Sequence, residues 1–281
     1  MRSLGIHLSY WQTSWSDDLL PLIHRARQAG FDGAEFPMLN PQQMDFQKIK
    51  TILDSEGMRA TCSTGLSSQT DITHPDPAIR AAGLAILRQC LEGAQVLGSP
   101  VLVGVTYAAW GVFPEGNWDE RRKTCITSLR EVGKFAGDLG ITLCLEVLNR
   151  FEGYLIPTVE KGLALLDEVG SSNVKLHLDT FHLNIEEADL AEAIRKAGKQ
   201  VGHFHCSENH RGMPGSGHIP WKLIKGALDE IDYRGWIVVE SFIRPEGEVG
   251  KGLFIWQSRG DDLDGLARRA VTFLRKDIGI A

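Results

Sequence analysis

Several features that would assign this chain of 281 residues to a large class of proteins are missing from its sequence. It has no uninterrupted apolar run of about 18 residues, so we expect no transmembrane helix and no membrane partner. It lacks GxGxxG after the first predicted strand and lacks GxxxxGK followed by Ser or Thr, the motifs that bind dinucleotides and nucleoside triphosphates. The segment MRSLGIHLSYWQ has no small-residue cleavage site, and we interpret it as a first strand, not a signal peptide.

Cysteine pairing motifs and an excess of positive charge are also absent. The five cysteines are odd in number and show no CxxC spacing, which favours reduced, buried thiols in a cytoplasmic protein. Acidic residues outnumber basic ones, 36 to 30, and the net charge of −6 argues against a nucleic acid as the main partner. We therefore expect a cytoplasmic protein that acts on a small molecule.

Strand-like and helix-like segments alternate from one end of the chain to the other. Density of β-branched and apolar residues predicts eight strands, at 4–10, 33–37, 59–63, 101–106, 142–148, 174–180, 201–207 and 236–242. Helical periodicity is found at 18–28, 46–55, 77–97, 120–139, 159–169, 187–197, 221–231 and 261–275. Eight alternations without a change of composition predict an α/β fold, a (β/α)8 TIM barrel that forms one domain over residues 1–281. A doubly wound parallel sheet is the alternative.

Four successive predicted strands in the second half of the chain each end in a polar residue that is able to bind a metal. These residues, spaced 33, 26 and 35 apart, are Glu146, Asp179, His205 and Glu240. An ionised side chain inside an apolar run is costly unless it is paired or coordinated. The carboxyl ends of the strands of a parallel barrel meet at one mouth, so we predict that these four side chains bind one divalent metal there. For each residue alone, a solvated strand end or an internal ion pair is the alternative.

The donor set also indicates the metal and the chemistry. Oxygen and nitrogen ligands without thiolates favour Mn²⁺, Co²⁺ or Mg²⁺ and allow Zn²⁺. We interpret His177 and His203, which point into the barrel below the metal, as core residues or outer partners and not as direct ligands. A metal that chelates adjacent oxygens of a ketose stabilises an enediolate. Glu146 and Glu240 come from separated strands and are predicted to move a proton on opposite faces of the sugar, without a redox cofactor.

Four long segments in the second half carry an ordered set of motifs. They are LEVLNRFEGY (145–154), LDTFHLNIEE (178–187), GHFHCSENHRGMPGSGHIPW (202–221) and GWIVVESF (235–242). Together they resemble the ketose 3-epimerases, the D-tagatose, D-psicose (allulose) and L-ribulose 3-epimerase group of the xylose-isomerase-like TIM barrels. The resemblance implies an isomerase that interconverts free ketohexoses or ketopentoses at C3. It also implies Mn²⁺ or Co²⁺, sometimes Mg²⁺, and a homodimer or homotetramer.

The resemblance further implies a role for each matching residue. The residues that match the metal ligands are Glu146, Asp179, His205 and Glu240. Glu146 and Glu240 also match the acid/base pair of the family. The residues that match those binding the sugar near O1 and O2 are Glu152, His182 and Arg211. His7 lies where some relatives carry an aromatic residue against the far end of the sugar, and its polarity leaves the preferred ketose open. Trp15 and Trp110 are expected as apolar walls of the pocket, with ordinary packing as the alternative.

Three other functions fit parts of the pattern. The same metal and glutamates would serve a hydroxypyruvate isomerase, an aldose–ketose isomerase or an inosose dehydratase, but the NRFEGY and TFH motifs favour the 3-epimerases. A DNA-repair endonuclease of this barrel type needs several zinc ions and a basic face, which the net charge of −6 opposes. A non-catalytic sugar-binding protein would tolerate the loss of one glutamate, and both are present.

Overall fold

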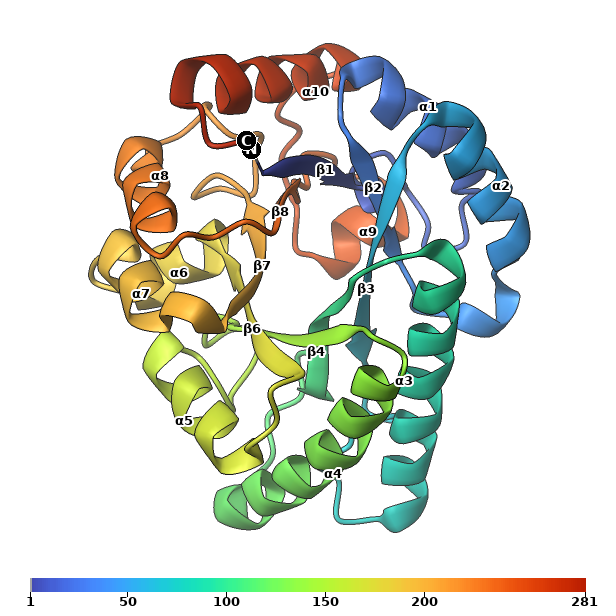
Figure 1. The fold of residues 1–281 in the computed structure, drawn as a ribbon, viewed down its shortest axis with the longest axis vertical. Coiled ribbons are helices and arrows are strands. Elements are labelled where there is room, and N and C mark those ends of the chain that lie inside the picture. The colour runs from blue at the N-terminus through green and yellow to red at the C-terminus, as the bar shows by residue number, and fades with distance from the viewer. Residues whose placement is uncertain (1) are drawn as a thin grey trace.

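A computed structural model describes residues 2–281 of the chain. They form a closed barrel in which each of eight parallel strands pairs with its neighbours in sequence and β8 pairs with β1 (Figure 1). The strands are β1 (Ser3–His7), β2 (Gly33–Pro37), β3 (Arg59–Leu66), β4 (Val101–Ala109), β5 (Thr142–Glu146), β6 (Val174–Asp179), β7 (Val201–Cys206) and β8 (Trp236–Val239). The predicted α/β barrel is therefore confirmed, and the pairing of β8 with β1 excludes an open, doubly wound sheet.

Helices fill the connections between the strands and form the outer layer of the barrel (Figure 1). They are α1 (Leu20–Ala29), α2 (Phe46–Glu56), α3 (Pro77–Leu97), α4 (Trp118–Asp138), α5 (Val159–Val169), α6 (Thr180–Glu186), α7 (Leu190–Ala197), α8 (Trp221–Glu230), α9 (Gly247–Gly252) and α10 (Leu263–Thr272). Short 3-10 turns lie at Leu8–Tyr10, Pro41–Gln43 and Gly198–Gln200, and a π-helical turn follows α10 at Phe273–Ile278.

Local sequence signals set the ends of the helices. The carboxylate of Asp76 caps the N-terminus of α3 by accepting from a backbone N–H at 2.8 Å, and the Thr158 hydroxyl caps α5 in the same way. Gly98 and Gly170 end the same two helices in the left-handed conformation, with φ of 71° and 67°. These caps explain why both helices occupy the ranges that periodicity predicts, 77–97 and 159–169.

Other elements differ from their predicted ranges. The first strand ends at His7 instead of residue 10, and the chain continues as a 3-10 turn. The helix predicted at 187–197 begins only at Leu190, because Asp189 caps it by accepting from a backbone N–H at 3.0 Å. Helices α6 and α9 are not predicted by periodicity. Each is only six or seven residues long, too short to carry a period of 3.6.

The apolar core lies mainly between the barrel and its helices, whereas the interior of the barrel is largely polar. Alternate residues of each strand face outward into the large core. The inward positions near one end of the barrel hold a small apolar cluster of Val101, Val103 and Cys144. Fully buried polar side chains occupy the interior beyond it: Glu35, Thr61, His177 and His203. The sequence thus places ionisable groups inside the barrel, close to its mouth.

Strands β3 and β4 are the longest of the barrel and open its mouth on one side. Their pairing shifts register between Gly65 and Leu66. Gly104 has φ of 102°, and a Cβ atom there would lie 2.4 Å from the carbonyl oxygen of Thr64. Only glycine permits this close approach. Gly65 and Gly104 line the cavity above these strands and add no side chain to it.

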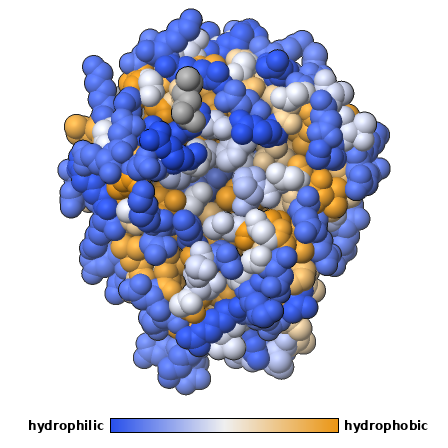
Figure 2. Space-filling view, viewed as in Figure 1, coloured by the Kyte–Doolittle hydropathy of each residue, from blue (hydrophilic) through white to orange (hydrophobic). Residues whose placement is uncertain are grey.

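The face of the molecule in Figure 2 is mostly hydrophilic, with separate apolar patches among charged residues. Within residues 2–281, no helix combines the length and the apolar composition that a membrane crossing requires. All five cysteines are buried and free, as their number and spacing predict.

Candidate active site

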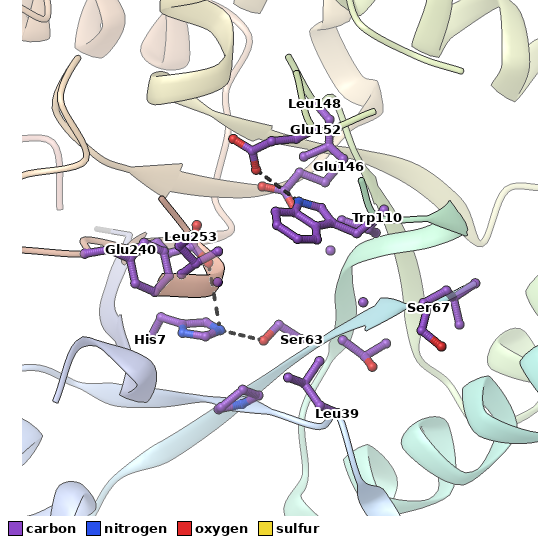
Figure 3. Close-up of a pocket in the computed structure, with 18 of the residues that line it drawn as sticks. His7, Leu39, Ser63, Ser67, Trp110, Glu146, Leu148, Glu152, Glu240 and Leu253 are labelled. Atoms are coloured by element: carbon purple, nitrogen blue, oxygen red, sulfur yellow. Dashed lines mark hydrogen bonds and ion pairs between the residues drawn. The ribbon is translucent and has the colours of Figure 1, made fainter. Parts of the chain in front are cut away.

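A cavity of about 460 Å³ opens at the carboxyl ends of the strands (Figure 3). Its wall includes nine of the ten predicted site residues: His7, Trp15, Trp110, Glu146, Glu152, His182, His205, Arg211 and Glu240. The tenth, Asp179, is fully buried next to them. In Figure 3, Glu146 and Glu152 lie on one side of the cavity, and His7 and Ser63 lie on the opposite side.

Four of these residues converge at the bottom of the cavity. Glu146 and Asp179 are the last residues of β5 and β6, His205 lies in β7, and Glu240 follows β8 directly. One ligand atom from each residue lies within 4.8 Å of the ligand atoms of the other three. The closed barrel is the cause of this convergence, because residues far apart in the sequence leave neighbouring strands at the same mouth.

The cluster carries more buried negative charge than its cations compensate. Burial, together with the charge of Glu240, raises the pKa of Glu146 well above its usual range. Burial is also the main cause that raises the pKa of Asp179 to about 6. Burial acts in the same direction on Glu240, but His205 and Arg211 outweigh it and hold the pKa of this carboxyl well below its usual range. Such a set of crowded carboxylates favours the binding of a cation.

The donor atoms fit a divalent metal. His205 Nε2 is bonded to Glu35 at 2.7 Å, while its Nδ1 lies 3.6 Å from Glu240 Oε2. Nδ1 is buried and has no hydrogen-bond partner among residues 2–281. Three carboxylates and one such imidazole nitrogen match the mixed oxygen and nitrogen ligands of Mn²⁺, Co²⁺ or Mg²⁺. These residues are therefore able to hold such an ion, whose identity the chain does not fix.

Arg211 connects this cluster with the upper wall of the cavity. Its Nη1 donates to Asp179 at 3.1 Å and to Glu240 at 3.0 Å, and its Nη2 lies 3.5 Å from Glu152. Burial alone would lower the pKa of Arg211, but the surrounding carboxylates raise it, so the guanidinium stays charged. Its position between the cluster and Glu152 places a fixed set of N–H donors beside the space for a ligand.

His182 and Glu152 are oriented by Asn149, which is not among the site residues predicted from the sequence. The Asn149 amide donates to His182 Nδ1 at 2.7 Å and to Glu152 at 2.9 Å. Burial lowers the pKa of His182 to about 4, so the ring is neutral. The backbone N–H of Asn149 also faces Nδ1, at 3.3 Å, and two donors on Nδ1 assign the ring proton to Nε2, 3.5 Å from Glu146. Trp110 donates its indole N–H to Glu152 at 3.0 Å. Trp110 is thus a polar partner of Glu152 as well as a wall of the cavity.

The opposite wall is neutral. His7 Nε2 lies 2.8 Å from Ser63 Oγ, and Nδ1 is bonded to the hydroxyl of Ser9. Burial lowers the pKa of His7, so the ring is uncharged at neutral pH. Its Nε2 lies 3.9 Å from Glu240 Oε1. Trp15 is half-buried and lines the same side. This wall offers hydrogen bonds and apolar contact but no fixed charge.

Glu35 is a buried carboxylate that is not among the residues predicted from the sequence. It lies in β2, is fully buried, and contacts His203, His205 and Thr61. The sequence does carry a signal for Glu35, because it is an acidic residue within the apolar strand GAEFP. A polar residue in an apolar strand is the same signal that predicted the four residues of the cluster. The position of Glu35 inside the strand and not at its end made it look different from them.

Comparisons with known proteins agree with this geometry. The sequence profile of the xylose isomerase-like TIM barrel family matches residues 23–276 and defines the class of the protein. An L-ribulose 3-epimerase of Methylomonas sp. (strain DH-1) is 38% identical over 97% of this chain and 96% of the relative. A D-psicose 3-epimerase of Agrobacterium fabrum is 35% identical over 98% of this chain and 99% of the relative.

A solved structure extends the likeness to three dimensions. The D-allulose 3-epimerase of Methylomonas sp. in complex with D-allulose superposes with a TM-score of 0.93, at 37% identity, over 98% of this chain and 96% of that protein. Within the xylose isomerase-like class, the chain therefore belongs to the ketose 3-epimerases. The family that the sequence motifs predict is confirmed.

Proposed function

We propose that this protein is a metal-dependent isomerase that interconverts free ketohexoses or ketopentoses at C3. D-fructose/D-psicose, D-tagatose/D-sorbose and L-ribulose/L-xylulose are the candidate pairs. The observation that carries the proposal is the position of Glu146 and Glu240 at the ends of two separated strands, within one cluster that fits a cation. The names of the relatives, L-ribulose 3-epimerase and D-psicose 3-epimerase, support the same reaction.

Glu146, Asp179, His205 and Glu240 would hold the metal. When bound, a divalent ion draws electron density from the carbonyl and a neighbouring hydroxyl of the ketose and makes the proton on C3 more acidic. Glu146 and Glu240 leave separated strands and in this proposal flank the sugar, so that one removes the C3 proton and the other returns a proton on the opposite face. The configuration at C3 is inverted, and no oxidant or reductant is consumed.

The upper wall orients the sugar for this transfer. The Arg211 guanidinium and the Nε2–H of His182 donate to the sugar oxygens near C1 and C2, and Glu152 accepts from a hydroxyl there. Asn149 and Trp110 keep Glu152 and His182 in place through the bonds described above. The remaining carbons of the sugar extend toward the neutral wall, where His7 and Trp15 contact them.

Product analysis tests the proposal. The Mn²⁺-loaded protein is incubated with D-fructose, D-tagatose and L-ribulose, and the products are identified by NMR. We expect formation of the C3 epimer of at least one ketose. An aldose product would instead support an aldose–ketose isomerase, and the absence of any product from all three ketoses would support a dehydratase or a sugar-binding protein.

We also propose that the protein assembles as a homodimer or homotetramer. Large aromatic side chains are exposed after β5, where Phe151 is 71% exposed, and after α9, where the rings of Phe254 and Trp256 lie 6.4 Å apart and Trp256 is 72% exposed. Exposed aromatic clusters favour contacts between proteins. Light scattering coupled to size-exclusion chromatography tests this proposal, and a mass of 31.1 kDa, that of one chain, would contradict it.

A further inference from the structure

We propose that Glu35 is a positioning residue that holds His205 in the orientation and tautomer required to bind the divalent metal. Glu35 does not line the cavity, and no oxygen of its carboxylate belongs to the four-residue cluster. Its Oε1 instead accepts a hydrogen bond from His205 Nε2 at 2.7 Å. The inference rests on the proposed metal centre and adds a residue to it that neither the motifs nor the cavity wall indicates.

The protonation of His205 follows from this hydrogen bond. A carboxylate only accepts hydrogen bonds, so the His205 nitrogen that faces Glu35 must carry a proton. The other nitrogen, Nδ1, faces Glu240 at 3.6 Å. When Nδ1 binds a cation, the one proton left on the ring is on Nε2, where Glu35 accepts it. A carboxylate that accepts from the outer nitrogen of a ligand histidine fixes the ring plane and increases the basicity of the ligand nitrogen.

Glu35 is itself held on both oxygens. Thr61, its partner in the register between β2 and β3, donates to Oε2 at 2.8 Å. His203 Nε2 lies 2.8 Å from the same oxygen. All four side chains of this set, Glu35, Thr61, His203 and His205, are at most 1% exposed. The carboxylate therefore has no room or solvent to turn away from His205, which is the rigidity that a support for a metal ligand needs.

The contact also crosses the barrel. Glu35 lies in β2 and His205 in β7, two strands that are not neighbours in the sheet and whose residues are 170 positions apart. A buried carboxylate, even with hydrogen-bond partners, contributes little net stability compared with an apolar residue of similar volume. The interior position would therefore be filled more favourably by an apolar side chain if folding were its only purpose. A role in metal binding accounts for the charge.

Titration of the metal-free protein with Mn²⁺ tests the inference. Isothermal titration calorimetry gives the dissociation constants of the unsubstituted protein and of Glu35→Gln, and thermal unfolding without metal gives their intrinsic stabilities. We expect Glu35→Gln to bind Mn²⁺ about 10- to 100-fold more weakly, the usual effect of losing an outer partner of a metal ligand. Its metal-free melting temperature is expected to change by only a few degrees.

A matched control is Asp71→Asn. Asp71 is also a buried carboxylate, 2% exposed, but it pairs with Arg121 at 3.1 Å and caps a turn outside the cluster. We expect this variant to bind Mn²⁺ within about twofold of the unsubstituted protein. If Glu35→Gln fails to fold, Thr61→Val replaces it: it removes one hydrogen bond to Glu35 and should weaken Mn²⁺ binding several-fold.

The outcomes separate this inference from the proposed function. Unchanged affinity in Glu35→Gln, or in Thr61→Val where that variant is used, would overturn the role of Glu35 while leaving the metal centre intact. Equal losses of affinity in Glu35→Gln and Asp71→Asn would also overturn it, because the effect would then be a general response to a disturbed interior. Failure of the unsubstituted protein to bind Mn²⁺, Co²⁺ or Mg²⁺ would overturn the metal centre itself, and the role of Glu35 with it.

Discussion

The two halves of the barrel contribute different chemistry to one cavity. Strands β5 to β8 supply the titratable groups at its bottom, which are Glu146, Asp179, His205 and Glu240. Strands β1 to β4 and the segments that follow them supply small, aromatic and hydroxyl side chains, such as Ser63, Gly104 and Trp110. His7 is the one titratable residue that this half adds to the wall. Within the part of the chain that the structure describes, charge is thus confined to one side of the cavity.

The difference between the two halves suggests that one carries out the reaction and the other selects the substrate. Groups that hold a cation and transfer protons must be charged or titratable, and their spacing is set by the reacting atoms. Groups that contact the rest of a sugar need only match its shape and hydroxyls, so they are able to vary without loss of the reaction. Among the residues that line the cavity, we expect changes in the half from β5 to β8 to affect turnover and changes in the half from β1 to β4 to affect substrate preference.

Removal of the metal should have the largest effect. Treatment with EDTA is expected to abolish activity, because the C3 proton is too weakly acidic without the cation, and added Mn²⁺ or Co²⁺ should restore it. Activity is measured on a sample whose metal content is checked by mass spectrometry. Full turnover in a sample verified to be metal-free would contradict the proposal that the charged residues of β5 to β8 act by binding a metal.

Substitution of either glutamate should come next. Glu146→Gln and Glu240→Gln each remove a proton-transfer group and disturb the metal site, so each is expected to lower kcat by at least about 10³-fold. Steady-state kinetics with the metal at saturation give the values. A loss of less than tenfold in one variant would show that its carboxylate is neither acid nor base.

Substitution on the neutral wall should change preference more than rate. His7→Phe removes the bonds to Ser9 and Ser63 and with them a polar group of the neutral wall, so the ratio of kcat/KM between ketoses is expected to change by about tenfold, the effect of one hydrogen bond of about 1.4 kcal/mol. The kcat on the best substrate should fall less than that. Ser63→Ala should alter the ratio in the same direction. An unchanged ranking of ketoses in both variants would place this wall outside the substrate contacts.

A substitution away from both halves of the cavity should have the smallest effect. Asp76→Ala removes the cap of α3 and is expected to lower the free energy of unfolding by about 1 kcal/mol without a change in kcat. Urea denaturation followed by circular dichroism measures the difference. A marked fall in kcat would mean that the outer helices influence the cavity more than the contacts indicate.

The sequence predicted the barrel and the convergence of its charged residues because both follow from local patterns. Eight apolar strands alternate with amphipathic helices, and caps such as Asp76 and Gly98 mark helix ends within a few residues. Once the strands are parallel and closed, Glu146 and Glu240 have to meet at one mouth. The closed parallel topology brings these two side chains close together, although 94 positions separate them in the sequence.

What the sequence did not predict depends on contacts between distant segments. Glu35 lies inside its strand and not at its end, and its contact with His205, 170 residues away on a strand that is not adjacent, exists only in the folded barrel. Asn149 belongs to a motif that the sequence shows, but its hydrogen bond to His182 forms only because the fold brings the segment after β5 next to α6. The short helix α9 has no period to detect, yet Gly252 at its end and the following Leu253 line the cavity.

The most direct test of the central claim follows deuterium from the solvent. One ketose is converted in D₂O by the Mn²⁺-loaded protein, and NMR measures deuterium at C3 in the product and in the recovered substrate at low conversion. Proton transfer by two glutamates on opposite faces predicts deuterium at C3 of the product while the recovered substrate remains protiated. A C3 epimer without solvent deuterium, or deuterium at C1 with formation of an aldose, would contradict it.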